Sequence, residues 1–113
     1  MKLELCSYDC PPKDPIENWI PDNDNDFFYE LTLSIGVKGS QGCDLFYVNV
    51  ISQNLKHKYE YQSQSIAVLP PYSFEKVLIE IKKIIESIDG ATWQVCVNQL
   101  LEHFRWEFEN YKQ

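Results

Sequence analysis

Length, composition and charge limit the classes of protein to which this chain can belong. It has 113 residues, of which 44% are hydrophobic and 14% aromatic, and a formal net charge of −7. A chain of this length forms one domain and buries enough apolar surface to need no metal ion or disulfide for stability. We therefore expect a single domain over residues 1–113. The acidic balance argues against nucleic-acid binding, in which Lys and Arg neutralise phosphates.

The negative charge is concentrated near the start of the chain. Residues 1–30 hold eight acids and two bases, so this segment alone carries −6 of the net −7. Such a segment favours a basic partner, or it serves solubility. The chain has no long apolar run, and Met1–Cys6 lacks the apolar stretch of a signal peptide. We therefore expect a cytoplasmic protein that does not enter a membrane.

The first half of the chain predicts strands with one short helical turn. Residues 2–8 can form a first strand. Residues 14–17 have the pattern of an acidic capping box with Pro at the first helical position, which predicts a turn that ends at Pro21. Its apolar side chains are expected on one face: Ile16, Trp19 and Ile20.

An antiparallel hairpin is the clearest prediction. Apolar residues alternate over residues 27–37, a glycine-containing turn follows at 38–42, and a second alternating strand carries Phe46, Val48 and Val50 toward the core. The opposite face of that strand carries Leu45, Tyr47 and Ile51. Exposure of these three side chains would predict a homodimer, and otherwise a monomer is expected.

The second half predicts one short strand and then two amphipathic helices. Residues 65–69 can pair with the hairpin, and Ser73 caps a helix with apolar residues at helical spacing up to Ile88. A break at Asp89-Gly90 precedes a second helix, which Thr92 caps and whose apolar pattern runs to residue 104. The fold class is therefore α+β, an antiparallel sheet of about four strands with both C-terminal helices packed on one face.

The motifs for metal binding and catalysis are incomplete. The four cysteines lack paired C-x-x-C spacing and are expected to be reduced, and neither His57 nor His103 lies in a zinc or nucleophile motif. The run Asp22-Asn23-Asp24-Asn25-Asp26 resembles the start of an EF-hand loop, but Phe27 replaces its glycine and the distal glutamate is missing. We expect no enzymatic activity, no metal and no cofactor. An enzyme that uses carboxylates and His57 is the weakest alternative.

Three stretches share an ordered pattern. Trp19-Ile20-Pro21 precedes the acidic loop and Phe27; Ile35-Gly36 precedes Gly39, Gly42, Phe46 and Val48; and Gly90-Ala91-Thr92-Trp93 precedes Leu100 and Trp106-Glu107-Phe108-Glu109-Asn110-Tyr111. This set, from Trp19 to Tyr111, resembles immunity protein 8, a family of bacterial polymorphic toxin systems. The segment 52–64 is the part that does not align with the family pattern.

The resemblance implies a protein that binds a cognate toxin domain and neutralises it by occlusion, without chemistry of its own. A toxin that acts in the cytosol fits a partner without a membrane segment, and the acidic charge suggests a nuclease. The expected contacts are Asp22, Asp24 and Asp26 of the acidic loop and Glu107, Glu109 and Tyr111 of the tail. For the loop, the alternative is a solvated connection, and for the tail it is docking on the chain's own sheet. The alternative function is a small interaction or adaptor domain in an unrelated complex.

Overall fold

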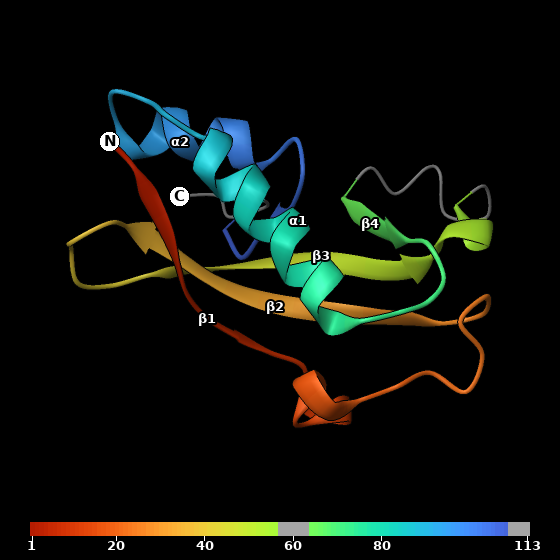
Figure 1. Cartoon of the computed structure of the whole chain (residues 1–113). Coiled ribbons are helices and arrows are strands. Elements are labelled where there is room, and N and C mark those ends of the chain that lie inside the picture. Colours follow the sequence, from red (N-terminus) through yellow and green to blue (C-terminus); the bar gives the residue numbers. More distant parts are fainter. Residues whose placement is uncertain (57–63, 109–113) are drawn as a thin grey trace.

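The computed structural model of the chain describes residues 1–56 and 64–108. A β-sheet forms one layer and two α-helices form the other, and both helices lie on the same face of the sheet (Figure 1). The elements of the described segments are β1 (Leu3–Asp9), β2 (Phe28–Val37), β3 (Asp44–Ser52), β4 (Ser65–Val68), α1 (Phe74–Ser87), α2 (Trp93–Leu100) and β5 (Arg105–Trp106). The predicted α+β class is confirmed.

The strand order of the sheet is β1-β2-β3-β4, and β5 joins the same edge of β3 that β4 uses. β2 and β3 form the predicted antiparallel hairpin, in which Leu31 lies opposite Val48 and Leu33 opposite Phe46. β4 runs parallel to β3, with Val50 opposite Ile66. Alternation of apolar residues indicates which face of a strand is buried but not the direction in which it pairs, so this parallel pairing was not predictable from the pattern.

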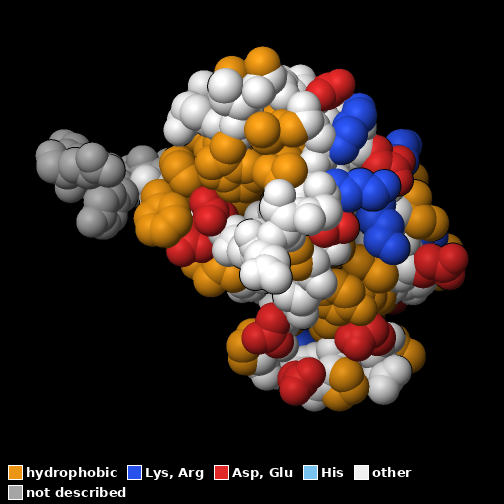
Figure 2. Space-filling model, turned by 90° about the vertical axis from the view of Figure 1, so that its left-hand side faces the viewer, with side chains coloured by type: hydrophobic (Ala, Val, Ile, Leu, Met, Phe, Trp, Pro, Cys, Tyr) orange, Lys and Arg blue, Asp and Glu red, His pale blue; other side chains and the backbone are white. Residues whose placement is uncertain are grey.

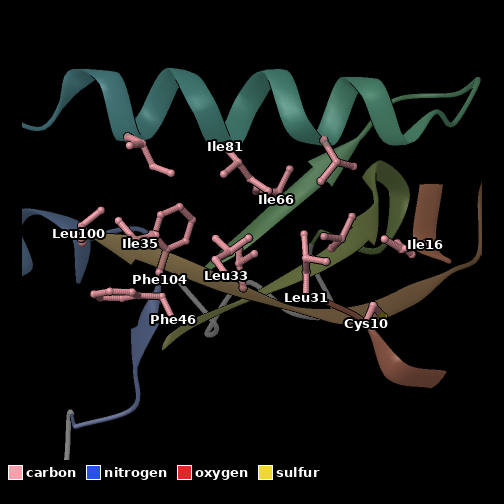
Figure 3. Close-up of a cluster of buried hydrophobic side chains, with 14 of the residues drawn as sticks. Cys10, Ile16, Leu31, Leu33, Ile35, Phe46, Ile66, Ile81, Leu100 and Phe104 are labelled. Atoms are coloured by element: carbon pink, nitrogen blue, oxygen red, sulfur yellow. The ribbon is translucent and has the colours of Figure 1, made fainter. Parts of the chain in front are cut away.

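The core lies between the sheet and the two helices. Leu31, Leu33 and Ile35 extend from β2 into this space, and Ile81 of α1 points toward them (Figure 3). All four side chains are fully buried. Burial of one such side chain contributes roughly 2 kcal/mol, so this layer supplies much of the driving force for folding. The period-two and helical patterns of the sequence therefore identified the core faces correctly.

Both predicted helix caps are present. The Ser73 hydroxyl accepts a hydrogen bond from the Lys76 amide at 3.3 Å, and the Thr92 hydroxyl accepts one from the Val95 amide at 3.2 Å. Gly90 has a second role, because a Cβ atom there would lie 2.8 Å from a methyl group of Val95. The glycine thus permits close packing of the connection against α2.

Two predictions about helical segments were wrong in detail. The capping box at residues 14–17 does not form, because Ile16–Asn18 is a single 3-10 turn whose cap is Pro15 and makes no side-chain hydrogen bond. Ile16 is buried, but Ile20 is 76% exposed because the helical turn has ended at Trp19, where the backbone is extended. The second helix ends at Leu100, and the buried Phe104 follows in a turn.

The start of the C-terminal tail docks on the chain's own sheet. Trp106 lies opposite Phe46 in the β3–β5 pairing, and the two rings stack with their centroids 6.3 Å apart. The Glu107 amide then donates to the Leu45 carbonyl at 3.0 Å. The predicted edge strand is therefore present at Arg105–Trp106, and Glu107 and Phe108 follow in a turn. Within the described residues, none of the helices has the length and apolarity to span a membrane.

Candidate functional site

The acidic loop begins beside a cluster of four aromatic rings at one end of the molecule. Trp19 makes edge contacts with Phe27, Tyr29 and Tyr72, at centroid distances of 6.1, 5.3 and 5.5 Å. The Tyr29 and Tyr72 hydroxyls are 2.8 Å apart, within hydrogen-bond distance. Trp19 thus packs within the fold, as predicted for a core anchor.

The three loop aspartates have different environments. Asp24 is half-buried, and its carboxylate accepts a hydrogen bond from the Tyr72 amide at 3.2 Å. Asp22 and Asp26 are exposed. Asp24 therefore holds the loop against the segment before α1, whereas Asp22 and Asp26 are the aspartates that face solvent.

The side chain of Lys13 lies over the Trp19 ring. The Lys13 ammonium lies 4.9 Å from the ring centroid, which is the distance of a cation–π contact. Aromatic, carboxylate and cation at this end are therefore all supplied by the chain itself.

A pocket of about 300 Å³ lies at the opposite end of the sheet, beside the turn between β2 and β3. Its wall is formed by the ends of the two strands, the turn, and the Trp93 side chain of α2. The lining residues are Ile35, Gly36, Val37, Ser40, Gln41, Gly42, Cys43, Asp44 and Trp93. We call this space the hairpin pocket.

Asp44 supplies the carboxylate of the hairpin pocket. One of its oxygens accepts a hydrogen bond from the Trp106 indole N–H at 3.0 Å. Next to it, the Leu45 amide donates to the Glu107 carboxylate, which fixes Glu107 on the edge of β3. Two acidic side chains are thus held beside each other by the docked tail.

The turn that forms the pocket wall is held by several constraints. Gly39 and Gly42 have φ angles of 84° and 90°, a backbone region that favours glycine. Cys43 is joined to Cys6 by a disulfide. A Cβ atom on Gly36 would lie 2.6 Å from the Gly42 carbonyl oxygen and 3.0 Å from the Cys43 sulfur, so a glycine is needed where the turn passes over β2.

The expectation that all four cysteines are reduced was therefore wrong. Cys6 sits at the point where the β1–β2 register shifts, between Leu5 and Ser7, and is exposed. This irregularity and the absence of a side chain at Gly36 let the sulfur atoms meet although Cys43 lies in the turn before β3 and β2 separates β3 from β1. Spacing in the sequence gives no sign of such a contact. Cys10 and Cys96 are free and buried.

Apolar side chains are exposed around the hairpin pocket. Figure 2 views the molecule from this end, and hydrophobic side chains gather over the upper part of the face, whereas Lys and Arg gather at one side. The exposed apolar side chains include Val95 of α2 and Phe108, whose ring contacts Trp106 at 5.4 Å, whereas Leu45 is exposed on the outer face of the sheet. This end therefore combines a concave site, carboxylates and exposed apolar surface.

On the outer face of the sheet, only one of the three side chains whose exposure would predict a homodimer is exposed. Leu45 is exposed, Tyr47 is half-buried with the Arg105 guanidinium over its ring, and Ile51 is buried. Arg105 also pairs with Glu30 of β2. This face thus carries a charged cluster that ties the tail to the sheet, and it does not form the continuous apolar surface expected of a homodimer interface.

The reactive side chains of the described residues are used internally. The Cys10 thiol donates to the Glu30 carbonyl at 3.4 Å, and burial raises the pKa of Cys10, which disfavours the nucleophilic thiolate. His103 lies after α2 with its ring against Phe104 at 6.3 Å. No group of three or more His, Cys, Asp or Glu side chains that could hold a metal ion occurs among residues 1–56 and 64–108.

The predicted contact residues fall into two separate groups. The acidic loop lies near the start of β2, whereas Glu107 lies at the hairpin end, on the edge of β3. The positions of Glu109 and Tyr111 lie outside the described residues. Sequence reasoning missed Asp44, and it gave no sign that Trp93, which packs against the core, also lines the pocket. The local signal for this turn in the sequence was the pair Gly39 and Gly42, both of which have a positive φ in the structure.

Comparison with known proteins gives one result. No curated protein and no solved structure matches this chain. The family model of immunity protein 8 matches residues 3–111, which is nearly the whole chain and includes both ends of the sheet described above. The chain therefore belongs to the immunity protein 8 family.

Proposed function

We propose that this chain binds a cognate bacterial toxin domain and neutralises it by occlusion, without catalysis. The observation that carries the proposal is the family match over residues 3–111, because an immunity protein family implies a toxin-neutralising role with a protein toxin as partner. Binding alone is sufficient for this function, since a protein that covers the working surface of a toxin prevents access of its substrate.

The environments of the reactive groups support a binding role. Cys10 is buried with a raised pKa, and His103 packs against an aromatic ring. By contrast, the hairpin end offers a pocket with a carboxylate and exposed apolar side chains, the mixture that protein interfaces use at their centre and rim. The hairpin pocket is therefore the proposed contact region, together with the adjacent Glu107.

The toxin is proposed to act in the cytoplasm and to have a basic active surface, as nucleases do. The net charge of −7 supports this choice, because complementary charge speeds association and orients the partners. Asp22 and Asp26 are proposed to contribute to that field from the other end of the molecule. Disulfides seldom persist in a reducing cytosol, so the Cys6–Cys43 disulfide does not support the cytoplasmic location expected from the sequence.

Co-expression of this chain with the toxin domain encoded beside it tests the proposal. Cells that receive the toxin domain alone should die, and cells that also receive this chain should survive and yield a stoichiometric complex on purification. The matched control is a toxin domain from an unrelated system, which this chain should neither bind nor neutralise. Death together with failure to form a complex would refute the immunity role and leave the adaptor function as the explanation.

A further inference from the structure

We infer that the hairpin pocket receives an arginine side chain of the toxin, with its guanidinium between the Trp93 ring and the Asp44 carboxylate. The inference rests on the proposed function, because it names the chemistry by which the partner is held. It commits to arginine because a planar guanidinium stacks on an indole and hydrogen-bonds a carboxylate at the same time.

The donors and acceptors of the pocket fit this occupant. One Asp44 oxygen is held by the Trp106 indole at 3.0 Å, which fixes the orientation of the carboxylate and leaves its charge unneutralised. No Lys or Arg lines the pocket, and none of the described residues forms an ion pair with Asp44 or places a cation over Trp93. A volume of about 300 Å³ is ample for one long side chain.

Trp19, at the other end of the sheet, shows which group lies over a tryptophan ring in this fold. At the acidic end, Trp19 carries the Lys13 ammonium 4.9 Å from its ring, and the Asp24 carboxylate accepts from the Tyr72 amide. The hairpin pocket has the same aromatic and acidic components but not the cation. The charge complementarity of the site therefore calls for a cation from outside the chain.

The pocket wall is formed before any partner arrives. The positive-φ glycines shape the turn, the disulfide fixes Cys43 to β1, and the Ser40 amide closes the turn by donating to the Val37 carbonyl at 3.0 Å. A wall that is already ordered avoids the entropic cost of forming it on binding. The Phe108 ring lies against Trp106 and adds exposed apolar surface beside the Trp106–Asp44 hydrogen bond.

The test is a binding measurement between the purified toxin domain and variants of this chain. Asp44→Asn removes the charge but keeps an oxygen that can accept from Trp106, so the fold should be preserved. We expect its affinity to fall about 10- to 100-fold. Asp14→Asn, the same change at an exposed aspartate that the proposed contact region does not include, is the matched control and should alter affinity less than about threefold.

A double-mutant cycle identifies the toxin residue. Each surface arginine of the toxin is replaced by alanine and measured with wild-type chain and with Asp44→Asn. One arginine should show a large loss with wild type and almost no further loss with Asp44→Asn. Wild-type binding together with an unchanged Asp44→Asn affinity, or with additive losses at every arginine, would overturn the inference. Failure of the wild-type chain to bind would instead refute the proposed function.

Discussion

Each end of the sheet has a tryptophan and an aspartate, but only the tryptophan at the acidic end has a cation over its ring among the described residues. At the acidic end, the half-buried Trp19 contacts three aromatic rings and has Lys13 over its ring, and the Asp24 carboxylate is hydrogen-bonded to a backbone amide. At the hairpin end, Trp93 lines a pocket and the Asp44 carboxylate has no cation beside it among the described residues. Each carboxylate accepts one N–H and neither forms an ion pair among the described residues, so the difference between the two ends is the cation that lies over Trp19 and not over Trp93.

This difference suggests that the residues at one end contribute mainly to the stability of the fold and those at the other end mainly to the binding of a partner. An aromatic and a carboxylate whose partners lie in the same chain contribute to folding, because their contacts exist before any ligand binds. The same groups at the wall of a pocket contribute little to folding and can contribute to affinity when a partner enters. The acidic loop is the more conspicuous feature of the sequence, yet its central aspartate is committed to an internal contact.

The largest effect should come from breaking the Cys6–Cys43 disulfide at the hairpin end. The two residues are 37 positions apart, so the loop-entropy model gives a loss of about 3 to 4 kcal/mol in unfolding free energy. Urea denaturation with and without dithiothreitol measures the loss. A Cys6→Ser/Cys43→Ser variant should start at the lower stability and not respond to the reductant. A response of the double variant equal to that of wild type would exclude the disulfide as the cause.

Paired alanine substitutions of the two tryptophans test the comparison directly. Trp19→Ala should lower the free energy of unfolding by about 2 to 3 kcal/mol, because it opens a cavity among three rings, and should leave toxin affinity unchanged. Trp93→Ala should cost about 1 kcal/mol in stability but weaken toxin binding at least tenfold. Urea denaturation and calorimetric titration provide the two readouts. Equal effects of both substitutions on affinity would remove the distinction between the ends.

Stability should fall in alkaline solution because of the tyrosine pair at the acidic end. Burial, and then the hydrogen bond to Tyr72, raise the pKa of Tyr29, and burial also raises the pKa of Tyr72. The folded state therefore keeps protons that the unfolded state releases above about pH 10, and the stabilisation is lost as the pH rises further. We expect a loss of about 1 kcal/mol between pH 10 and pH 11.

Urea denaturation at a series of pH values checks this slope. A Tyr29→Phe/Tyr72→Phe variant lacks both titrating hydroxyls and should lose most of the alkaline dependence. A slope that persists in this variant would assign the effect to other groups.

The smallest effect should come from charge reversal at the exposed part of the acidic loop. Asp22→Lys/Asp26→Lys leaves the Asp24–Tyr72 contact in place and should slow association with the toxin by a few-fold, with little change in dissociation. Stopped-flow kinetics at several salt concentrations measure the two rates. Unchanged association at low salt would mean that the loop is a solvated connection and would leave the hairpin pocket as the proposed contact region.

The sequence by itself determined the secondary structure and the faces that are buried. Alternation along β2 and β3 and helical spacing along α1 predicted the core, because side-chain direction follows directly from backbone periodicity. The Ser73 and Thr92 caps were equally predictable, since a cap involves residues only three positions apart. Local interactions leave local signals, and these signals were read correctly apart from the short turn before Trp19 and the end of the second helix.

Only the tertiary structure decided the contacts between residues distant in the sequence. The direction of β4, the Cys6–Cys43 disulfide and the Asp44–Trp106 hydrogen bond all join segments that no local pattern connects. The same holds for the assignment of Asp24 to an internal contact and of Trp93 to a pocket wall. Whether a polar or aromatic side chain is satisfied within the chain or left for a partner depends on what the fold places next to it. The residue types alone do not carry that information.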